Sequence, residues 1–293
     1  MFTKRWFCRK LPRAAGTKAV LDQTETETRR RLMSATSSSD YGKKCLDVFK
    51  ADVSLGENYL FWTLPFGSPE TAQLYGAMRT IESGIFAKRL EVLRNERIQG
   101  AIVEFGVFSG EGLATIVDKC EELGITPPIY GFDSFEGLPE PTADDLPDCW
   151  YGGEYACPME RVAQRLKCDS RPHVHLVKGW FCDTLKSAAI VGNPELERIA
   201  FARIDCDLYD STVDCLDFLT DRLVDGAFLV FDDWTHRLDL GETRAFFEYH
   251  DRVKDVYRFE HLAAIGRGSL HLRVWRNRPA RKAAAYCFRI NSQ

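Results

Sequence analysis

The sequence predicts an α/β protein: a doubly wound, mostly parallel sheet preceded by an N-terminal helical extension. From about residue 100 onward, short apolar runs alternate with segments of helical periodicity, which is the pattern of βαβ units. Two of these runs, residues 199–207 and 227–234, are rich in Ile, Val and Phe and end in carboxylates. About twenty residues of helical character lie between them, so we expect two parallel strands joined by a crossover.

Two different segments precede this pattern. Residues 1–21 contain six Lys or Arg and no acid, and residues 1–40 offer little apolar surface to bury. We interpret them as a flexible basic and polar extension of a cytoplasmic protein, although an acid-free, Arg-rich start also resembles an organelle transit peptide. Residues 41–98 have helical patterns and are expected to form a cap or an oligomer surface. The face expected to pack carries Leu74, Met78, Ile81, Ile85 and Leu90.

The composition excludes several classes of protein. A formal net charge of −4 is not typical of a nucleic-acid binder, and no apolar stretch reaches the roughly 18 residues that span a membrane. The chain has ten cysteines but no CxxC pair. We therefore expect reduced thiols and no structural zinc.

The main domain is expected over residues 99–278. Strands are predicted at 101–105, 129–132 and 174–177, followed by the two carboxylate-ended runs, and helices at 109–123 and 159–166. Residues 256–262 and 269–275 are predicted to close the sheet as an antiparallel pair, with Gly266 and Gly268 in the turn. Residues 279–293 are expected to form a C-terminal tail.

The carboxylates that end the two apolar runs are expected to meet. Parallel strands place their carboxyl ends at one edge of the sheet, so Asp205 or Asp207 should face Asp232 and Asp233. Crowded carboxylates repel one another unless a cation or a proton lies between them. The pattern thus predicts either a hard divalent metal or one carboxylate with a raised pKa.

A glycine turn follows the first predicted strand. Its spacing from Glu104 to Gly112 is E-x-G-x-x-x-G-x-G, which differs from the G-x-G-x-x-G of dinucleotide enzymes. Asp133, about twenty residues further on, is placed to accept hydrogen bonds from ribose hydroxyls. After the third strand, Trp180, Phe181 and Asp183 could hold an adenine ring. Together these features predict an adenosine-sized site beside the carboxylates.

The stretches VEFGVFSGEG, YGFDSFEGLPEP, VKGWFCDTL, RIDCDLYDST and FLVFDDW identify a resemblance. They are similar to the macrocin O-methyltransferase family of class I S-adenosylmethionine-dependent enzymes, which methylate sugar hydroxyls of macrolide antibiotics. The resemblance spans residues 100 to 250. It implies a seven-stranded methyltransferase sheet, S-adenosylmethionine, Mg²⁺ and a small-molecule hydroxyl acceptor. It also implies homo-oligomers in which N-terminal helices help to shape the active site.

The resemblance also implies site residues. Those implied for the cofactor are Glu104, Gly106, Ser109 and Gly110 at its methionine and ribose part, Asp133 and Ser134 at the ribose, and Gly179, Trp180 and Asp183 at the adenine end. Those implied for the metal are Asp205, Asp232 and Asp233. Asp207 is interpreted as a helix cap or a solvated loop acid.

One departure from the family pattern concerns the general base. The resemblance implies a histidine in the loop before the third strand, but residues 139–160 contain none. Asp205 and His236 are the candidate catalytic residues, and the metal is expected to lower the pKa of the attacking hydroxyl. Other expected proton acceptors are Asp144, Asp145, Glu154 or water. Aromatic side chains expected to stack on the acceptor are Trp150, Tyr151, Tyr155 and Trp234.

Two alternative functions stay open at this stage. The missing histidine allows a catalytically inactive binding protein that keeps the methyltransferase fold. A nicotinamide-dependent oxidoreductase is the second alternative, and the absent G-x-G-x-x-G motif argues against it.

Overall fold

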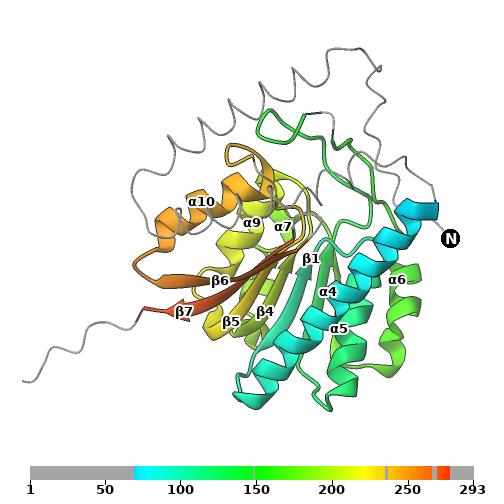
Figure 1. Ribbon diagram of the computed structural model, residues 1–293, viewed down its shortest axis with the longest axis vertical. Coiled ribbons are helices and arrows are strands. Elements are labelled where there is room, and N and C mark those ends of the chain that lie inside the picture. The colour runs from blue at the N-terminus through cyan, green and yellow to red at the C-terminus, as the bar shows by residue number, and fades with distance from the viewer. Residues whose placement is uncertain (1–68, 148, 235–236, 266–268, 278–293) are drawn as a thin grey trace, which may run out of the picture.

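A computed structural model of the protein describes residues 69–147, 149–234, 237–265 and 269–277. Their strands form one seven-stranded sheet of order β3-β2-β1-β4-β5-β7-β6 (Figure 1). β1 to β5 are parallel, whereas β7 is antiparallel to both β5 and β6. The predicted fold class is therefore confirmed. The predicted extension over 1–40, residues 41–68 of the predicted cap and the tail over 279–293 lie outside the described residues.

Every predicted strand is present. The strands are β1 (Ala101–Phe105), β2 (Ile129–Asp133), β3 (Val174–Lys178), β4 (Ile199–Ile204), β5 (Leu223–Phe231), β6 (Tyr257–Ile265) and β7 (Ser269–Arg276). All residues of β1, β2 and β4 are buried. Parallel strands covered on both faces read as continuous apolar runs, which is why their sequence signal was clear.

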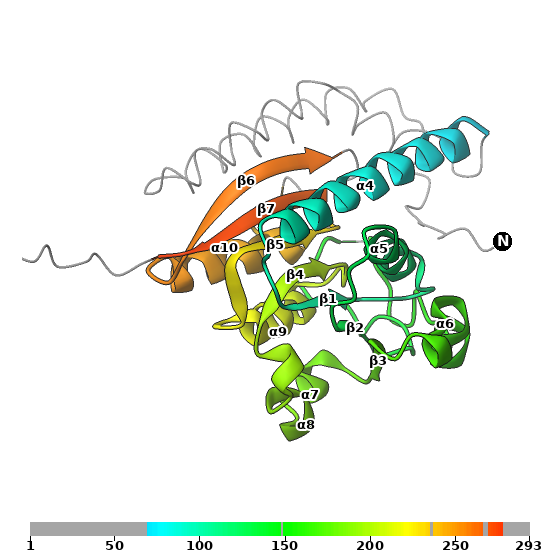
Figure 2. The same ribbon diagram turned by 90° about the horizontal axis from the view of Figure 1, so that it is seen from below.

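Helices cover both faces of the sheet. They are α4 (Pro69–Asn95), α5 (Glu111–Glu122), α6 (Met159–Leu166), α7 (Phe181–Thr184), α8 (Ala188–Val191), α9 (Tyr209–Leu219) and α10 (Gly241–Val253), with 3₁₀ turns η1 (Cys168–Ser170) and η2 (Pro194–Leu196). Figure 2 shows α4, α5 and α6 along one face and the other four helices along the opposite face. The crossover between β4 and β5 is α9, as the sequence predicts.

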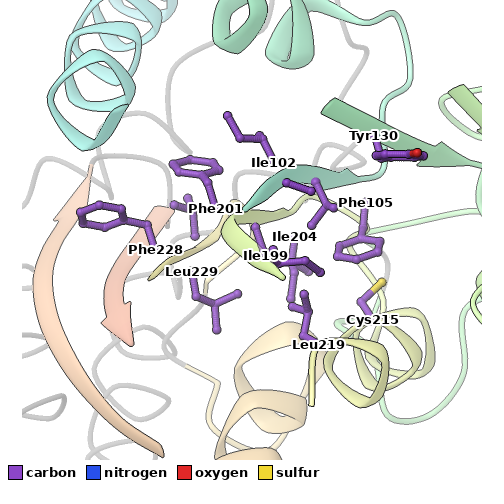
Figure 3. Close-up of a cluster of buried hydrophobic side chains, with 14 of the residues drawn as sticks. Ile102, Phe105, Tyr130, Ile199, Phe201, Ile204, Cys215, Leu219, Phe228 and Leu229 are labelled. Carbon is purple, nitrogen blue, oxygen red and sulfur yellow. The ribbon is translucent and has the colours of Figure 1, made fainter. Parts of the chain in front are cut away.

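The core divides between these two faces because side chains alternate along each strand (Figure 3). On the α4 face, the ring of Phe201 from β4 meets the ring of Phe86 edge-on, with 5.9 Å between centroids. On the α9 face, Phe105 of β1 packs against Phe218 of α9, with 6.1 Å between centroids. Because β1, β4 and β5 are neighbouring parallel strands, their carboxyl ends lie together at one edge of the sheet.

Helix α4 packs on the sheet with a face that shares only Leu90 with the buried residues predicted for it. Phe86, Leu90 and Leu93 are buried, whereas Ile81 is 53% exposed. The buried residues follow the i, i+4, i+7 spacing of one helical face. That face also carries Arg89, whose guanidinium lies over the ring of Phe228. A charged residue within the packed face explains why apolar spacing alone placed only Leu90 correctly and missed Phe86 and Leu93.

Two expectations from composition hold among the described residues. None of the described helices is long and apolar enough to span a membrane. The described cysteines at 120, 149, 157, 168, 182, 206 and 215 are all free thiols, as predicted.

Candidate functional site

A cavity of about 500 Å³ opens at the carboxyl edge of the sheet, where open α/β sheets bind ligands. Its walls come from the loops after β1, β2, β3 and β4, from the first turns of α9, and from the segment over residues 137–155, which we call the covering segment. Five predicted cofactor residues line it, namely Gly106, Asp133, Ser134, Gly179 and Trp180. The cavity also contains Asp205 and is large enough for a nucleoside-sized ligand.

The carboxylate of Asp133, at the end of β2, holds the turn that follows β1. Its Oδ2 accepts hydrogen bonds from the main-chain N–H groups of Val107 (2.7 Å) and Phe108 (2.8 Å). Its Oδ1 accepts one from Phe135 N–H (2.6 Å). A carboxylate has about four acceptor sites, so Asp133 can still accept a hydrogen bond from a ligand hydroxyl in the cavity.

The glycine turn owes part of its composition to the protein itself. Gly106 has φ +87°, and a Cβ there would collide with the carbonyl oxygen of Asp205. Gly110 has φ +78° and faces α6, where a Cβ would lie 2.9 Å from Val162. Both positions therefore require glycine for backbone conformation and close packing, independently of any ligand.

The other four predicted cofactor residues do not line the cavity, and they are Glu104, Ser109, Gly110 and Asp183. The side chain of Glu104 is 1% exposed and forms an ion pair with Arg203 on the α4 face of the sheet. Asp183 is exposed on the short helix α7, whose Cys182 lines the cavity in its place. Glu104 thus contacts Arg203 and Asp183 faces solvent, and their contacts with a cofactor stay predictions.

The structure brings together the three acids that the resemblance implied for the metal. Asp205, Asp232 and Asp233 each offer a carboxylate oxygen, and these atoms lie within 4.8 Å of one another. Oxygen-only donors suit hard cations such as Mg²⁺. The donor set therefore fits the metal that the resemblance implies, and Asp205 connects it to the cavity.

A buried guanidinium, which the sequence did not reveal, lies beside this triad. Arg203, near the end of β4, is 3% exposed and forms ion pairs with Asp205 Oδ2 (2.9 Å) and Asp232 Oδ1 (2.8 Å). It also pairs with Glu104 of β1 and, at 3.8 Å, with Glu82 of α4. Burial lowers the pKa of Arg203, but the charges of Asp205 and Asp232 raise it well above its ordinary value. The guanidinium is therefore charged.

A second buried group, also missed by the sequence, joins the ends of β4 and β5. Glu242 in the first turn of α10 is 1% exposed. Its carboxyl oxygens accept hydrogen bonds from the N–H groups of Cys206 (3.3 Å) and Asp233 (3.1 Å). Burial, followed by the charge of Asp233, raises the pKa of Glu242 well above its ordinary value. A carboxyl with a raised pKa is thus present at this edge. It belongs to Glu242 and not to one of the strand-end aspartates for which the sequence predicted it.

Asp207 differs from its interpretation as a cap or a solvated acid. It is 8% exposed, has φ +66° and lines the cavity. The first N–H of α9, on Tyr209, instead bonds to Asp145 Oδ1 (2.6 Å). Asp145 reaches α9 from the covering segment, so a residue distant in sequence performs the capping predicted for Asp207.

The acids expected as alternative proton acceptors lie in the covering segment, where each forms hydrogen bonds or an ion pair with protein groups. Asp145 Oδ2 accepts from the N–H of Thr142 (2.7 Å), and Asp144 forms an ion pair with Arg244 of α10 (2.5 Å). Glu154 accepts from the N–H of Tyr151 (3.0 Å). All three side chains hold the segment in place, which weakens their candidacy as bases.

Of the aromatic residues expected to stack on an acceptor, Tyr155 lines the cavity. Burial, followed by the charges of Asp207 and Asp233, raises the pKa of its phenol. Trp150 and Trp234 are buried, and Trp234 packs against Phe246 of α10 at 5.6 Å between centroids. The candidate catalytic residue His236 lies outside the described residues.

Comparison with known proteins adds a family. A family model described as macrocin-O-methyltransferase (TylF) matches residues 76–261. The chain is 32% identical over 156 residues to "8-demethyl-8-(2,3-dimethoxy-alpha-L-rhamnosyl)-tetracenomycin-C 4'-O-methyltransferase" of Streptomyces olivaceus, a match covering 50% of this chain and 57% of that protein. It is 27% identical over 161 residues to "Mycinamicin III 3''-O-methyltransferase" of Micromonospora griseorubida, covering 50% and 59%. The chain thus spans less than two thirds of each relative.

Two solved structures share the fold. NovP, an O-methyltransferase, superposes with a TM-score of 0.56 at 22% identity, covering 67% of this chain and 80% of NovP. CalS11, a calicheamicin methyltransferase, superposes with a TM-score of 0.54 at 22% identity, covering 91% and 95%. These similarities establish the class of sheet that carries the cavity and the acid triad.

Proposed function

The chain belongs to the macrocin-O-methyltransferase (TylF) family, and from this premise we propose that it methylates a hydroxyl of a small molecule. The proposed donor is S-adenosylmethionine, and the proposed acceptor is a hydroxyl on the sugar of a natural product. Relatives whose names specify rhamnosyl tetracenomycin and mycinamicin support this class of acceptor. The observation that carries the proposal is an acid triad that adjoins a nucleoside-sized cavity through Asp205.

The residues around the cavity have separate proposed roles. Asp133, Ser134, Gly179 and Trp180 would hold the donor, which supplies an electrophilic methyl group when bound. Asp205, Asp232 and Asp233 would hold a divalent cation, which lowers the pKa of a hydroxyl when bound. Methyl transfer from a sulfonium is an in-line displacement, so positioning by these residues contributes much of the rate.

The proton of the attacking hydroxyl needs an acceptor. Asp205 is the triad member that lines the cavity, so its proposed catalytic role is to hold the cation beside the hydroxyl, while a water molecule in the cavity would accept the proton. The covering segment over residues 137–155 closes the same space and limits access of water. Tyr155, whose raised pKa keeps it protonated, is a hydrogen-bond donor rather than a base there.

The test combines donor turnover with metal dependence. Full-length protein is incubated with S-adenosylmethionine carrying a labelled methyl group and with methyl rhamnoside or catechol as acceptors. We expect a methyl ether that disappears in EDTA and returns with Mg²⁺. Asp232→Asn should lower the rate by roughly 100-fold or more, since it removes a charged ligand. Asp217→Asn, on the exposed side of α9, is the matched control.

Three other results would point elsewhere. Full activity in EDTA together with an active Asp232→Asn variant contradicts the metal. Binding of S-adenosylhomocysteine without turnover of any acceptor favours the non-catalytic alternative. Binding of NADH in place of S-adenosylhomocysteine favours the oxidoreductase.

Assembly into homo-oligomers belongs to the same proposal. Light scattering after size-exclusion chromatography should give a multiple of the 33.4 kDa chain mass. A mass equal to one chain contradicts it.

A further inference from the structure

We propose that Arg203 is a positioning residue for the metal acids, fixing Asp205 and Asp232 in place before a cation arrives. The inference rests on the metal-assisted function proposed above, and it assigns to Arg203 a role that the acid triad alone does not suggest. Arg203 itself offers no ligand atom to a cation. Its effect would be exerted through the two aspartates that it contacts.

The geometry of the guanidinium supports this role. Nη1 contacts Asp205 Oδ2 at 2.9 Å, and Nη2 donates to Asp232 Oδ1 at 2.8 Å. Each aspartate thus gives one oxygen to Arg203. The two nitrogens belong to one planar, rigid group, so they set the separation of the ends of β4 and β5. The compact ammonium of a lysine cannot reproduce this fork.

Arg203 is itself held from several elements. Glu104 lies directly opposite it in the register of β1 and β4 and forms an ion pair with it. Glu82 approaches from α4, and the ring of Phe86 lies 5.8 Å from the guanidinium carbon. On α5, a Cβ at Gly112 would collide with Arg203 Nη1, so the helix backbone closes over the pair. These contacts leave the guanidinium little freedom to swing away.

Arg203 is a shared partner of several acids. Four carboxylates lie within 4.0 Å of the single positive charge of Arg203, from Glu82, Glu104, Asp205 and Asp232. Asp233 adds a further acid at the triad. One guanidinium therefore connects acids from α4, β1 and the ends of β4 and β5, which is the position of a group that organises the triad.

A purely structural ion network predicts something different. Buried ion pairs are weak evidence for stability, and breaking one destabilises the fold wherever it lies. Groups that orient metal ligands, in contrast, typically change metal affinity by about 10–100-fold when replaced. A variant that stays folded but binds the metal more weakly therefore indicates a positioning role. A variant that loses only stability indicates a purely structural role.

The test measures Mn²⁺ binding by isothermal titration calorimetry on the full chain without donor or acceptor. We expect Arg203→Lys to weaken Mn²⁺ binding by about tenfold or more, since lysine keeps the charge but loses the fork. The melting temperature in EDTA reports folding separately. Arg171→Lys is the matched control, because Arg171 pairs with Asp118 and Glu121 away from the site. It should leave Mn²⁺ affinity unchanged.

A second pair of variants keeps the test decisive if Arg203→Lys does not fold. Gly112→Ala adds a methyl group against the Arg203–Glu104 pair without changing any charge. We expect several-fold weaker Mn²⁺ binding. Gly84→Ala, in open space on α4, should bind Mn²⁺ like the wild type.

The outcomes are distinguishable from failure of the proposed function. If wild-type protein binds no Mn²⁺, both the metal-assisted function and this inference are overturned. If wild-type protein binds Mn²⁺ and Arg203→Lys binds it equally or more tightly, only the role of Arg203 is overturned. The same conclusion follows if Arg203→Lys is unfolded and Gly112→Ala binds with wild-type affinity.

Discussion

The carboxyl edge of the sheet holds acids in two different ways. At the end of β2, the carboxylate of Asp133 accepts three main-chain N–H groups from the turns around it. At the ends of β4 and β5, Asp205 and Asp232 instead share the guanidinium of a buried arginine. Main-chain donors make the first acid part of a turn. The second pair of acids is held by ion pairs with one arginine side chain.

This difference indicates which half of the site is suited to which ligand. Main-chain N–H groups are neutral and fixed, so Asp133 shapes the wall of the cavity and retains capacity for a hydroxyl. The arginine-held acids belong to an oxygen donor set of the kind that suits a hard divalent cation. The two halves meet where Gly106 packs against the main chain of Asp205. We expect substitutions in the two halves to have different consequences.

The largest of these effects is expected for Asp133→Asn. Asparagine offers one acceptor oxygen, and its NH₂ group would face a main-chain N–H that it cannot bond. We expect stability to fall by about 3 kcal/mol, the cost of leaving buried donors unsatisfied. Affinity for S-adenosylhomocysteine should fall at least tenfold as the turn loosens. Urea denaturation and calorimetric titration measure the two quantities.

Mn²⁺ affinity is the control for Asp133→Asn, and it should be unchanged if the two halves are independent. A variant that loses stability but binds S-adenosylhomocysteine normally would show that Asp133 only holds the turn.

An intermediate effect is expected from His271 of β7, beneath the arginine-held acids. Burial, followed by the charge of Arg89, lowers the pKa of His271 from 6.5 to about 3. Between these values the unfolded chain binds a proton that the folded protein does not, so stability falls as pH falls through this window. From pH 7 to pH 5 the loss should be roughly 2 kcal/mol.

His271→Asn removes the titrating group and serves as the comparison. Between pH 7 and pH 5, the free energy of unfolding measured in urea should fall less for this variant than for the wild type. The difference between the two losses should be roughly 2 kcal/mol. Equal losses in both proteins would contradict the assigned pKa.

Most of the fold was accessible from the sequence because its strands are buried on both faces. The runs at β1 and β4 are apolar apart from one charged residue each, Glu104 and Arg203, and α6 was predicted with its observed bounds. Helix α10 was missed, although its buried residues Ala245, Phe246, Tyr249 and Val253 follow a helical spacing that could have revealed it. For α4 the predicted face was right at Leu90 but missed Phe86 and Leu93, because the charged residue Arg89 shares the packed side.

The candidate site divides along the same line. The acid triad was predicted because each acid ends a recognisable strand. Arg203 and Glu242 were not, because their partners are distant in sequence: Glu104 lies 99 residues from Arg203, and Cys206 lies 36 residues from Glu242. A charged residue inside an apolar strand, as Arg203 is in β4, is the signal that could have directed attention to a buried ion network.

The smallest change in stability is expected at two adjacent acids of the covering segment. One of them is held by main-chain N–H groups and the other by an arginine, as at the two halves of the site. Asp145 is held by main-chain N–H groups of Thr142 and Tyr209, whereas the half-exposed Asp144 is held by the guanidinium of Arg244. Asp145→Asn should cost about 1 kcal/mol, as the loss of a helix cap does. Asp144→Asn should change stability by less than about 0.5 kcal/mol, because solvent screens an exposed ion pair. Urea denaturation of both variants gives the comparison directly. A larger cost for Asp144→Asn would mean that charge, and not main-chain bonding, holds this segment over the cavity.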